Sequence, residues 1–121
     1  MNPLWGGLSV AAIAGELVTA ATNTAMYTYE IAPIATLVES SILKRMAELA
    51  DFGTAQGTLT TGGSNGNLLG LLCARQAKFP LSNHTGFNGE NVVAFVSEEC
   101  HYSFGIASNV IGIGSSNLIK V

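Results

Sequence analysis

The chain has 121 residues and a mass of 12.5 kDa, which is enough for one domain at most. Charged residues make up 11% of it, against about 25% in typical globular domains, whereas apolar residues make up 48%. This composition excludes a disordered chain, and a net charge of −3 without a basic patch argues against a nucleic-acid partner. With so few charges to cover its surface, we expect the chain to be a piece of a larger protein or an obligate oligomer.

The first half of the chain predicts two helices. Apolar residues recur at near-helical spacing over 8–22, and Asn23 breaks this pattern. Residues 27–33 are expected to be extended or turn-like, because Pro33 disfavours the helical conformation in the residue before it. Pro33 also suits the first turn of a new helix, which we expect over 33–50. One face of this second helix is apolar, formed by Ile34, Leu37, Val38, Ile42, Met46 and Leu49.

The second half predicts alternating helices and strands. A helix is expected over 64–78, then a polar loop over 81–91. The apolar run within 91–97 is typical of a strand that is buried on both faces of a parallel sheet. A short helix with a glycine-rich end is expected over 101–112, and a second strand over 118–121. The order predicts an α/β fold with an incomplete sheet. No segment is apolar enough to span a membrane, and no basic segment marks a signal peptide, so we expect a cytoplasmic protein.

The first motif that carries chemistry is the glycine-rich segment that leads into the third helix, Gly62-Gly63-Ser64. Glycines let the backbone approach a ligand closely, and the free N–H groups at a helix N-terminus favour a phosphate. The Ser64 hydroxyl is expected to bond a phosphate oxygen or to cap the helix. Taken alone, the segment also fits a plain turn followed by a helix cap.

The second motif follows the first predicted strand, where His101 stands at the strand's carboxyl end. Ligands of open α/β sheets bind at this edge. The His101 ring could stack on a flat cofactor or transfer protons, or it could be a structural hydrogen-bonding residue. The neighbouring thiol of Cys100 has little support as a nucleophile, because adjacent side chains usually point in different directions. We expect Cys73 and Cys100 to be buried free thiols.

A third segment, Tyr27-Thr28-Tyr29-Glu30, combines two tyrosines with a threonine and a carboxylate. Its composition has no unique interpretation, and a packed connection between two helices would explain it equally well.

Together these segments resemble the group II pyridoxal-phosphate-dependent decarboxylases, in particular the branch that acts on glutamate, cysteine sulfinate and aspartate. The likeness runs in order and without large gaps from about residue 2 to 121. The residues that carry it are Asn23-Thr24, Tyr27 to Pro33, Gly62 to Leu68, Ala74-Arg75, Ser97, His101-Tyr102-Ser103, Ile111 to Gly114 and Asn117.

The resemblance implies a role for each segment. Gly62, Gly63 and Ser64 would form the phosphate-binding loop for pyridoxal phosphate, and His101 would stack on the pyridine ring of this cofactor. Residues Tyr27 to Glu30 would form a loop near the substrate and the dimer interface.

The implied fold is part of the large domain of fold-type I enzymes, with N-terminal helices before the first strands of a mainly parallel sheet. We expect residues 1–50 to be a helical dimerisation segment and residues 51–121 to begin the cofactor-binding domain. The family implies a homo-oligomer, most simply a dimer. Nothing in the residues suggests a metal site.

The family's Schiff-base lysine follows a histidine, whereas Lys44, Lys78 and Lys120 follow Leu, Ala and Ile. The chain therefore lacks this lysine, and we expect an N-terminal fragment that is inactive alone. The alternative is a small non-catalytic protein that keeps the family's helical surface and serves only for association.

Overall fold

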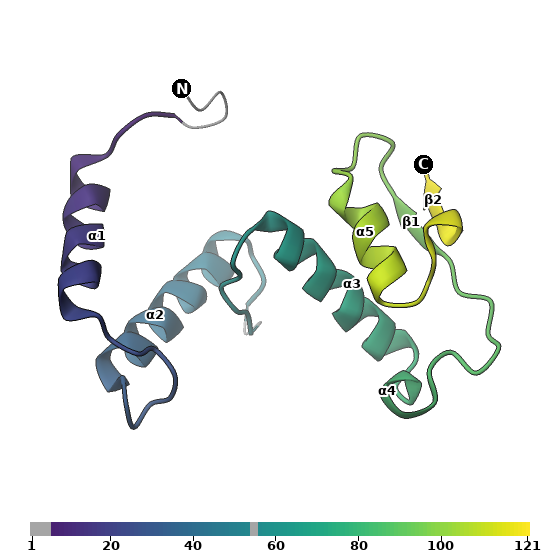
Figure 1. Ribbon diagram of the computed structural model, residues 1–121, viewed down its shortest axis with the longest axis horizontal. Helices are drawn as coiled ribbons and strands as arrows, with labels where there is room; N and C mark the ends of the chain where they lie inside the picture. Colours follow the sequence, from purple (N-terminus) through teal and green to yellow (C-terminus); the bar gives the residue numbers. More distant parts are fainter. Residues whose placement is uncertain (1–5, 54–55) are drawn as a thin grey trace. The chain divides into compact units, whose positions relative to one another are not determined.

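The computed structural model describes residues 6–53 and 56–121 (Figure 1). Residues 1–5, part of the predicted dimerisation segment 1–50, lie outside the described residues. The chain divides into two compact units, Met1–Thr58 and Leu59–Val121, and each is described by itself.

The first unit begins with α1, Val10–Thr22, which confirms the first predicted helix with a later start. The Ser9 hydroxyl caps it by accepting a hydrogen bond from the Ala12 N–H at 3.4 Å. Asn23 ends it in the left-handed conformation, with φ 43° and ψ 44°, which asparagine tolerates better than most residues. No residue of α1 is buried.

The second helix, α2, spans Pro33–Leu49, with Pro33 in its first turn as predicted. A turn precedes it, in which the Thr28 carbonyl accepts hydrogen bonds from the Ile31 and Ala32 N–H groups. The apolar face of α2 is exposed in this chain, since its six apolar residues keep between 46% and 76% of their accessible surface. The helix stops at Asp51, which has φ 57°.

The second unit opens with α3, Gly63–Lys78. The polar loop predicted over 81–91 is partly wrong, because α4, Ser82–Thr85, forms one helical turn there. Its last N–H and the Thr85 hydroxyl both bond to the Leu81 carbonyl, at 3.0 and 3.2 Å. The rings of Phe79 and Phe87 pack edge to face, with their centroids 5.6 Å apart. This contact joins the residues on either side of the turn.

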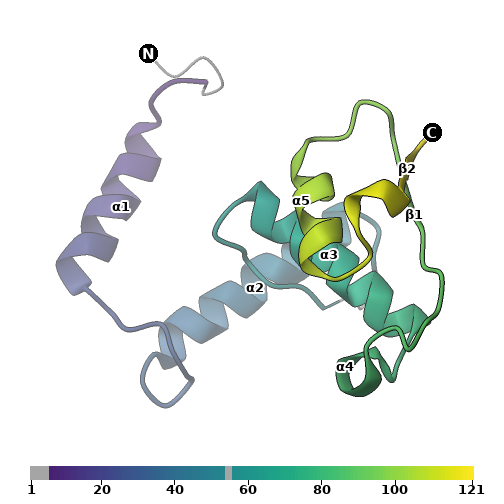
Figure 2. The ribbon, with the colours of Figure 1, turned by 45° about the vertical axis from the view of Figure 1, so that its right-hand side comes forward.

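The remainder is a βαβ arrangement, as Figures 1 and 2 show: β1 is Ala94–Val96, α5 is Ser103–Val110 and β2 is Leu118–Lys120. A single 3-10 turn, η1 (Ser115–Asn117), precedes β2. The strands are parallel, with Ala94 opposite Leu118, and the predicted α/β fold is therefore confirmed. Burial of the first strand on both faces was a wrong expectation, since Phe95 is 66% exposed. Within the described residues β1 pairs with β2, and no further layer covers the Phe95 side chain.

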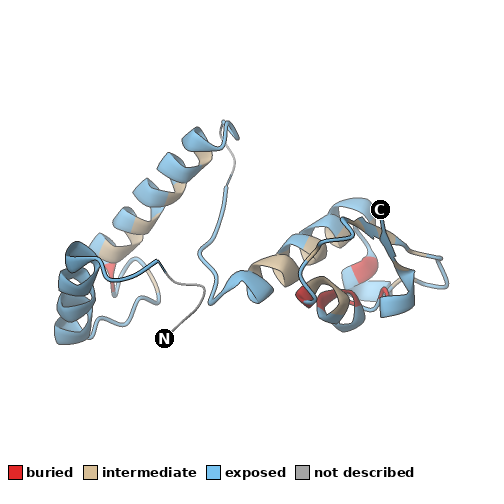
Figure 3. Cartoon of the chain, turned by 90° about the horizontal axis from the view of Figure 1, so that it is seen from above, coloured by how far each residue is buried: buried red, intermediate tan, exposed pale blue. Residues whose placement is uncertain are grey.

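The core of the second unit is small and centred on α5, where Figure 3 shows most of the buried residues. The fully enclosed Ser108 hydroxyl donates to the Gly105 carbonyl at 2.9 Å. The leucines of α3 are half-buried, and α3 packs on α5. The expectation of two buried thiols was wrong, because Cys73 is exposed and Cys100 is half-buried. Among the described residues, no helix has the length and apolar character to cross a bilayer.

Candidate functional site

The N-terminus of α3 has an open, glycine-containing backbone. Gly62 precedes the helix with φ 156° and ψ 167°, a conformation that is essentially restricted to glycine. A side chain added at Gly62 or Gly63 would meet no atom within 4 Å, so the backbone is open there. The first helical bond joins the Gly66 N–H to the Gly62 carbonyl, which leaves the preceding N–H groups without helical partners. Gly62 is itself the cap, so of the two alternatives for the Ser64 hydroxyl, capping the helix was wrong, and the bond to a phosphate oxygen stays a prediction.

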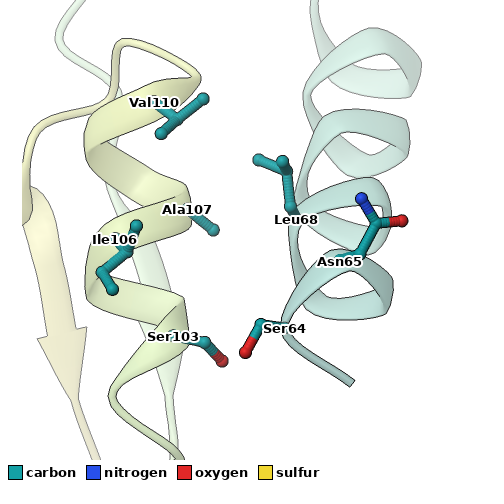
Figure 4. A pocket seen from close by; sticks show the side chains of 7 residues that line it. All are labelled: Ser64, Asn65, Leu68, Ser103, Ile106, Ala107 and Val110. Atoms are coloured by element: carbon teal, nitrogen blue, oxygen red, sulfur yellow. The ribbon is translucent and has the colours of Figure 1, made fainter. Parts of the chain in front are cut away.

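The N-terminus of α5 lies beside that of α3. Both helices border a pocket of about 250 Å³, lined by Ser64, Asn65, Leu68, Ser103, Ile106, Ala107 and Val110. In Figure 4 the hydroxyls of Ser64 and Ser103 lie at one end of this pocket, and the aliphatic side chain of Val110 lies toward the other. The two helices therefore place their N-terminal ends, which carry the positive ends of their dipoles, at the same polar end of the pocket.

A hydrogen-bonded chain of side chains connects the two helices at this end. The Asn67 side-chain amide, on α3, donates to the Ser103 Oγ at 2.8 Å. The same Oγ lies 2.9 Å from His101 Nδ1, and the Ser103 N–H donates to Nδ1 at 3.3 Å. Ser103 is 3% exposed, so its hydroxyl is a buried polar group with partners on both sides. The structure thus connects His101 through hydrogen bonds to α3.

The ring of His101 is exposed and in contact with one other ring. The Tyr102 ring lies with its centroid 4.2 Å away and its plane tilted by 37°. Tyr102 therefore covers part of one face of the imidazole, and a flat ligand would need the other face.

The Tyr27 to Glu30 segment belongs to the first unit, where it forms the turn before α2. Tyr27 and Tyr29 are exposed, at 83% and 57%. Hydrogen bonds from the Glu30 backbone N–H and from the Thr28 hydroxyl hold the pKa of the Glu30 carboxyl below its usual value. The position expected for the Tyr27 to Glu30 segment, near the substrate and the dimer interface, stays a prediction.

The three lysines are exposed, and none of them lines the pocket. The Lys120 Nζ bonds to the Glu98 carbonyl at 3.3 Å. In the part of the chain that the structure describes, no three His, Cys, Asp or Glu residues cluster as metal ligands would.

Sequence reasoning missed the contact between Asn67 and Ser103. Both stand inside the motifs that carry the family resemblance, but nothing in their spacing indicates a contact across 36 positions. The signal that could have identified Ser103 is its place two residues after His101, within reach of the histidine ring.

In class, this is part of an α/β domain in which the N-terminal ends of α3 and α5 meet at the polar end of a pocket. The chain matches the pyridoxal-dependent decarboxylase conserved domain over residues 2–121, and it belongs to that family of pyridoxal-phosphate-dependent amino-acid decarboxylases. The family and fold predicted from the sequence are therefore confirmed.

Among its relatives, the chain is 39% identical to a glutamate decarboxylase of Drosophila melanogaster, over 99% of this chain and 24% of the relative. It is 36% identical to a cysteine sulfinic acid decarboxylase of Rattus norvegicus, over 97% of this chain and 24% of the relative. A crystal structure of mouse CSAD superposes with a TM-score of 0.93 at 34% identity, over 99% of this chain and 26% of that one. The chain thus spans about a quarter of the length of the relatives it matches.

Proposed function

We propose that this chain supplies the cofactor phosphate site and the ring-stacking histidine of a pyridoxal-phosphate-dependent carboxy-lyase that acts on an acidic amino acid. In this proposal Gly62, Gly63 and Ser64 hold the phosphate, and His101 packs against the pyridine ring. The acidic substrate is supported by the names of the relatives, which include decarboxylases of glutamate and of cysteine sulfinic acid. The cytoplasmic location expected from the sequence is part of the same proposal.

The observation that carries the proposal is the meeting of two helix N-termini at one polar end of the pocket. The backbone N–H groups without helical partners at the start of α3 and the positive ends of the two helix dipoles together attract a phosphate dianion. The open backbone at Gly62 and Gly63 gives the phosphate oxygens access to these N–H groups. The residues present therefore fit the phosphate end of the cofactor.

When bound, pyridoxal phosphate supplies an electron sink for the electrons released as carbon dioxide leaves. The residues of this chain bind and orient it: the α3 N-terminus fixes the phosphate, and the His101 ring presents a flat face. Holding the cofactor covalently requires a lysine that follows a histidine in this family, and Lys44, Lys78 and Lys120 do not match that pattern. We therefore expect weak, non-covalent binding, with a dissociation constant near the millimolar range, roughly −4 kcal/mol.

A titration with inorganic phosphate and with pyridoxal phosphate, followed by amide NMR shifts, tests this assignment. The largest shifts are expected at the N–H groups of Gly63, Ser64 and Asn65. A Gly62→Ala variant should abolish these shifts, because alanine does not readily adopt φ 156°. Gly70→Ala is the matched control, since Gly70 lies on the same helix in open space. Largest shifts elsewhere, or equal effects of the two variants, would refute the phosphate site.

We further propose that the chain associates with itself, most simply as a dimer. Its support is the exposed apolar surface of α1 and α2, where Leu17 is 67% exposed and Ile34 is 76% exposed. The same surface supports the alternative of a non-catalytic association protein. The two functions differ in the phosphate titration, because a protein that only associates needs no affinity at the α3 N-terminus.

A further inference from the structure

Nδ1 of His101 is a hydrogen-bond acceptor in this structure. The backbone N–H of Ser103 can only donate, and it points at Nδ1 from 3.3 Å. A nitrogen that accepts this bond carries no proton. In the neutral ring the proton is therefore on Nε2.

The direction of the remaining bonds follows from that assignment. Since Nδ1 accepts, the Ser103 hydroxyl donates its only proton across the 2.9 Å to Nδ1. The hydroxyl oxygen can then accept, and the Asn67 amide, which can only donate from Nδ2, fills that position at 2.8 Å. All three bonds are consistent with one arrangement of protons.

We propose that Ser103 and Asn67 are positioning residues for His101, which hold its imidazole in the Nε2–H tautomer and in one orientation relative to the N-terminus of α3. This inference rests on the proposed function for its purpose, because a ring fixed in orientation offers a constant face to a planar cofactor. The hydrogen bonds themselves exist in the chain without any cofactor, so they can be tested separately.

The burial of the network makes the arrangement specific. Ser103 is 3% exposed, so water does not readily replace its partners. Asn67 comes from a different helix, and its amide therefore ties the orientation of the ring to the position of α3. Tyr102, tilted against the imidazole at 4.2 Å, limits rotation from one side.

The test is a long-range ¹H–¹⁵N NMR spectrum of the imidazole nitrogens, recorded without cofactor on the whole chain. A His84→Gln background removes the second histidine, so that only His101 contributes signals. We expect a hydrogen-bonded, unprotonated Nδ1 and a protonated Nε2. In Ser103→Ala the Nδ1 signal should shift toward that of a histidine in an unstructured peptide, and Ser103→Thr should restore it because the hydroxyl returns. Unchanged ring signals in a folded Ser103→Ala variant would overturn the proposal.

A second pair of variants decides the matter if Ser103→Ala fails to fold. Asn67→Asp has nearly the same shape but accepts hydrogen bonds, so the Ser103 hydroxyl should turn toward it and away from Nδ1. Cys73→Asp adds the same charge on the same helix, at an exposed position outside the pocket. We expect the Nδ1 shift to change only in the first variant, and equal changes in both would refute the inference. If the tautomer is as expected but phosphate does not bind, the proposed function alone is contradicted.

Discussion

Arg75 is predicted to anchor the C-terminal end of α5. Its Nη1 donates to the Ile111 carbonyl at 2.9 Å, and Ile111 is the residue that ends α5. The guanidinium also lies 5.9 Å from the centroid of the Phe87 ring. An Arg75→Ala substitution removes both contacts and leaves the carbonyl of the buried Ile111 without its partner.

The size of the effect follows from these contacts. A hydrogen bond from a charged group contributes about 2 kcal/mol, and the cation–π contact about 1 kcal/mol. Two costs reduce this stabilisation. Ordering the long Arg75 side chain costs about 1 kcal/mol or more, and its Nε is buried without a partner. We therefore expect the opening free energy of this helix end to fall by about 1.5 kcal/mol, which corresponds to about tenfold.

Amide hydrogen exchange measures this opening locally. The Ile111 and Ile113 N–H groups bond to the Ala107 and Ser108 carbonyls at 3.0 and 2.9 Å, so they exchange when the end of α5 opens. Arg75→Ala should raise both rates about tenfold. Lys78→Ala is the control, because Lys78 is an exposed cation near the end of the same helix. Rates within about twofold of one another in the two variants would refute the anchoring role.

Three further predictions concern activity, self-association and the pH dependence of the turn before α2. With added pyridoxal phosphate, we expect no carbon dioxide release from glutamate, cysteine sulfinate or aspartate; release that is lost in His101→Ala would contradict this. Light scattering at tens of micromolar should give a mass above the monomer, and a monomeric mass with a cooperative melt would count against self-association. Because its pKa is lowered on folding, Glu30 stabilises the turn above its unfolded pKa, and this contribution is lost as pH falls through the folded pKa. Thr28→Val should raise the Glu30 pKa toward its usual value, as a ¹³C titration of the carboxyl can measure; an unchanged midpoint would show that the hydroxyl has no part in the shift.

Local chemistry explains why most element boundaries could be predicted. Pro33 fixes a backbone angle suited to a first helical turn, and Asn23 tolerates the left-handed conformation that closes α1. Both effects act within a few residues and can be recognised in the sequence. The single turn at Ser82–Thr85 could not be predicted in the same way, since it combines local bonds with the contact between the Phe79 and Phe87 rings.

Burial and site geometry depend on residues that are far apart in the chain. The apolar run around Phe95 predicts a strand correctly, but its exposure depends on which layers are present to cover it. The open N-terminus of α3, where we propose the phosphate site, could be predicted from Gly62 and Gly63, because helix N-termini carry their own partial charge. The partners of His101 could not, because the bond between Asn67 and Ser103 joins two helices that only the fold brings together.

The pairing of β1 with β2 has a consequence for the order in which the chain folds as it is synthesised. The ladder is closed by the Val121 N–H, which bonds to the Val96 carbonyl, and by the Glu98 N–H, which bonds to the Val121 carbonyl. All its partners thus lie between Ala94 and Val121, so closing the intervening loop costs little entropy. The strand, helix and strand can therefore assemble as soon as Val121 has left the ribosome. They would then offer a preformed parallel edge on which any later strand can nucleate.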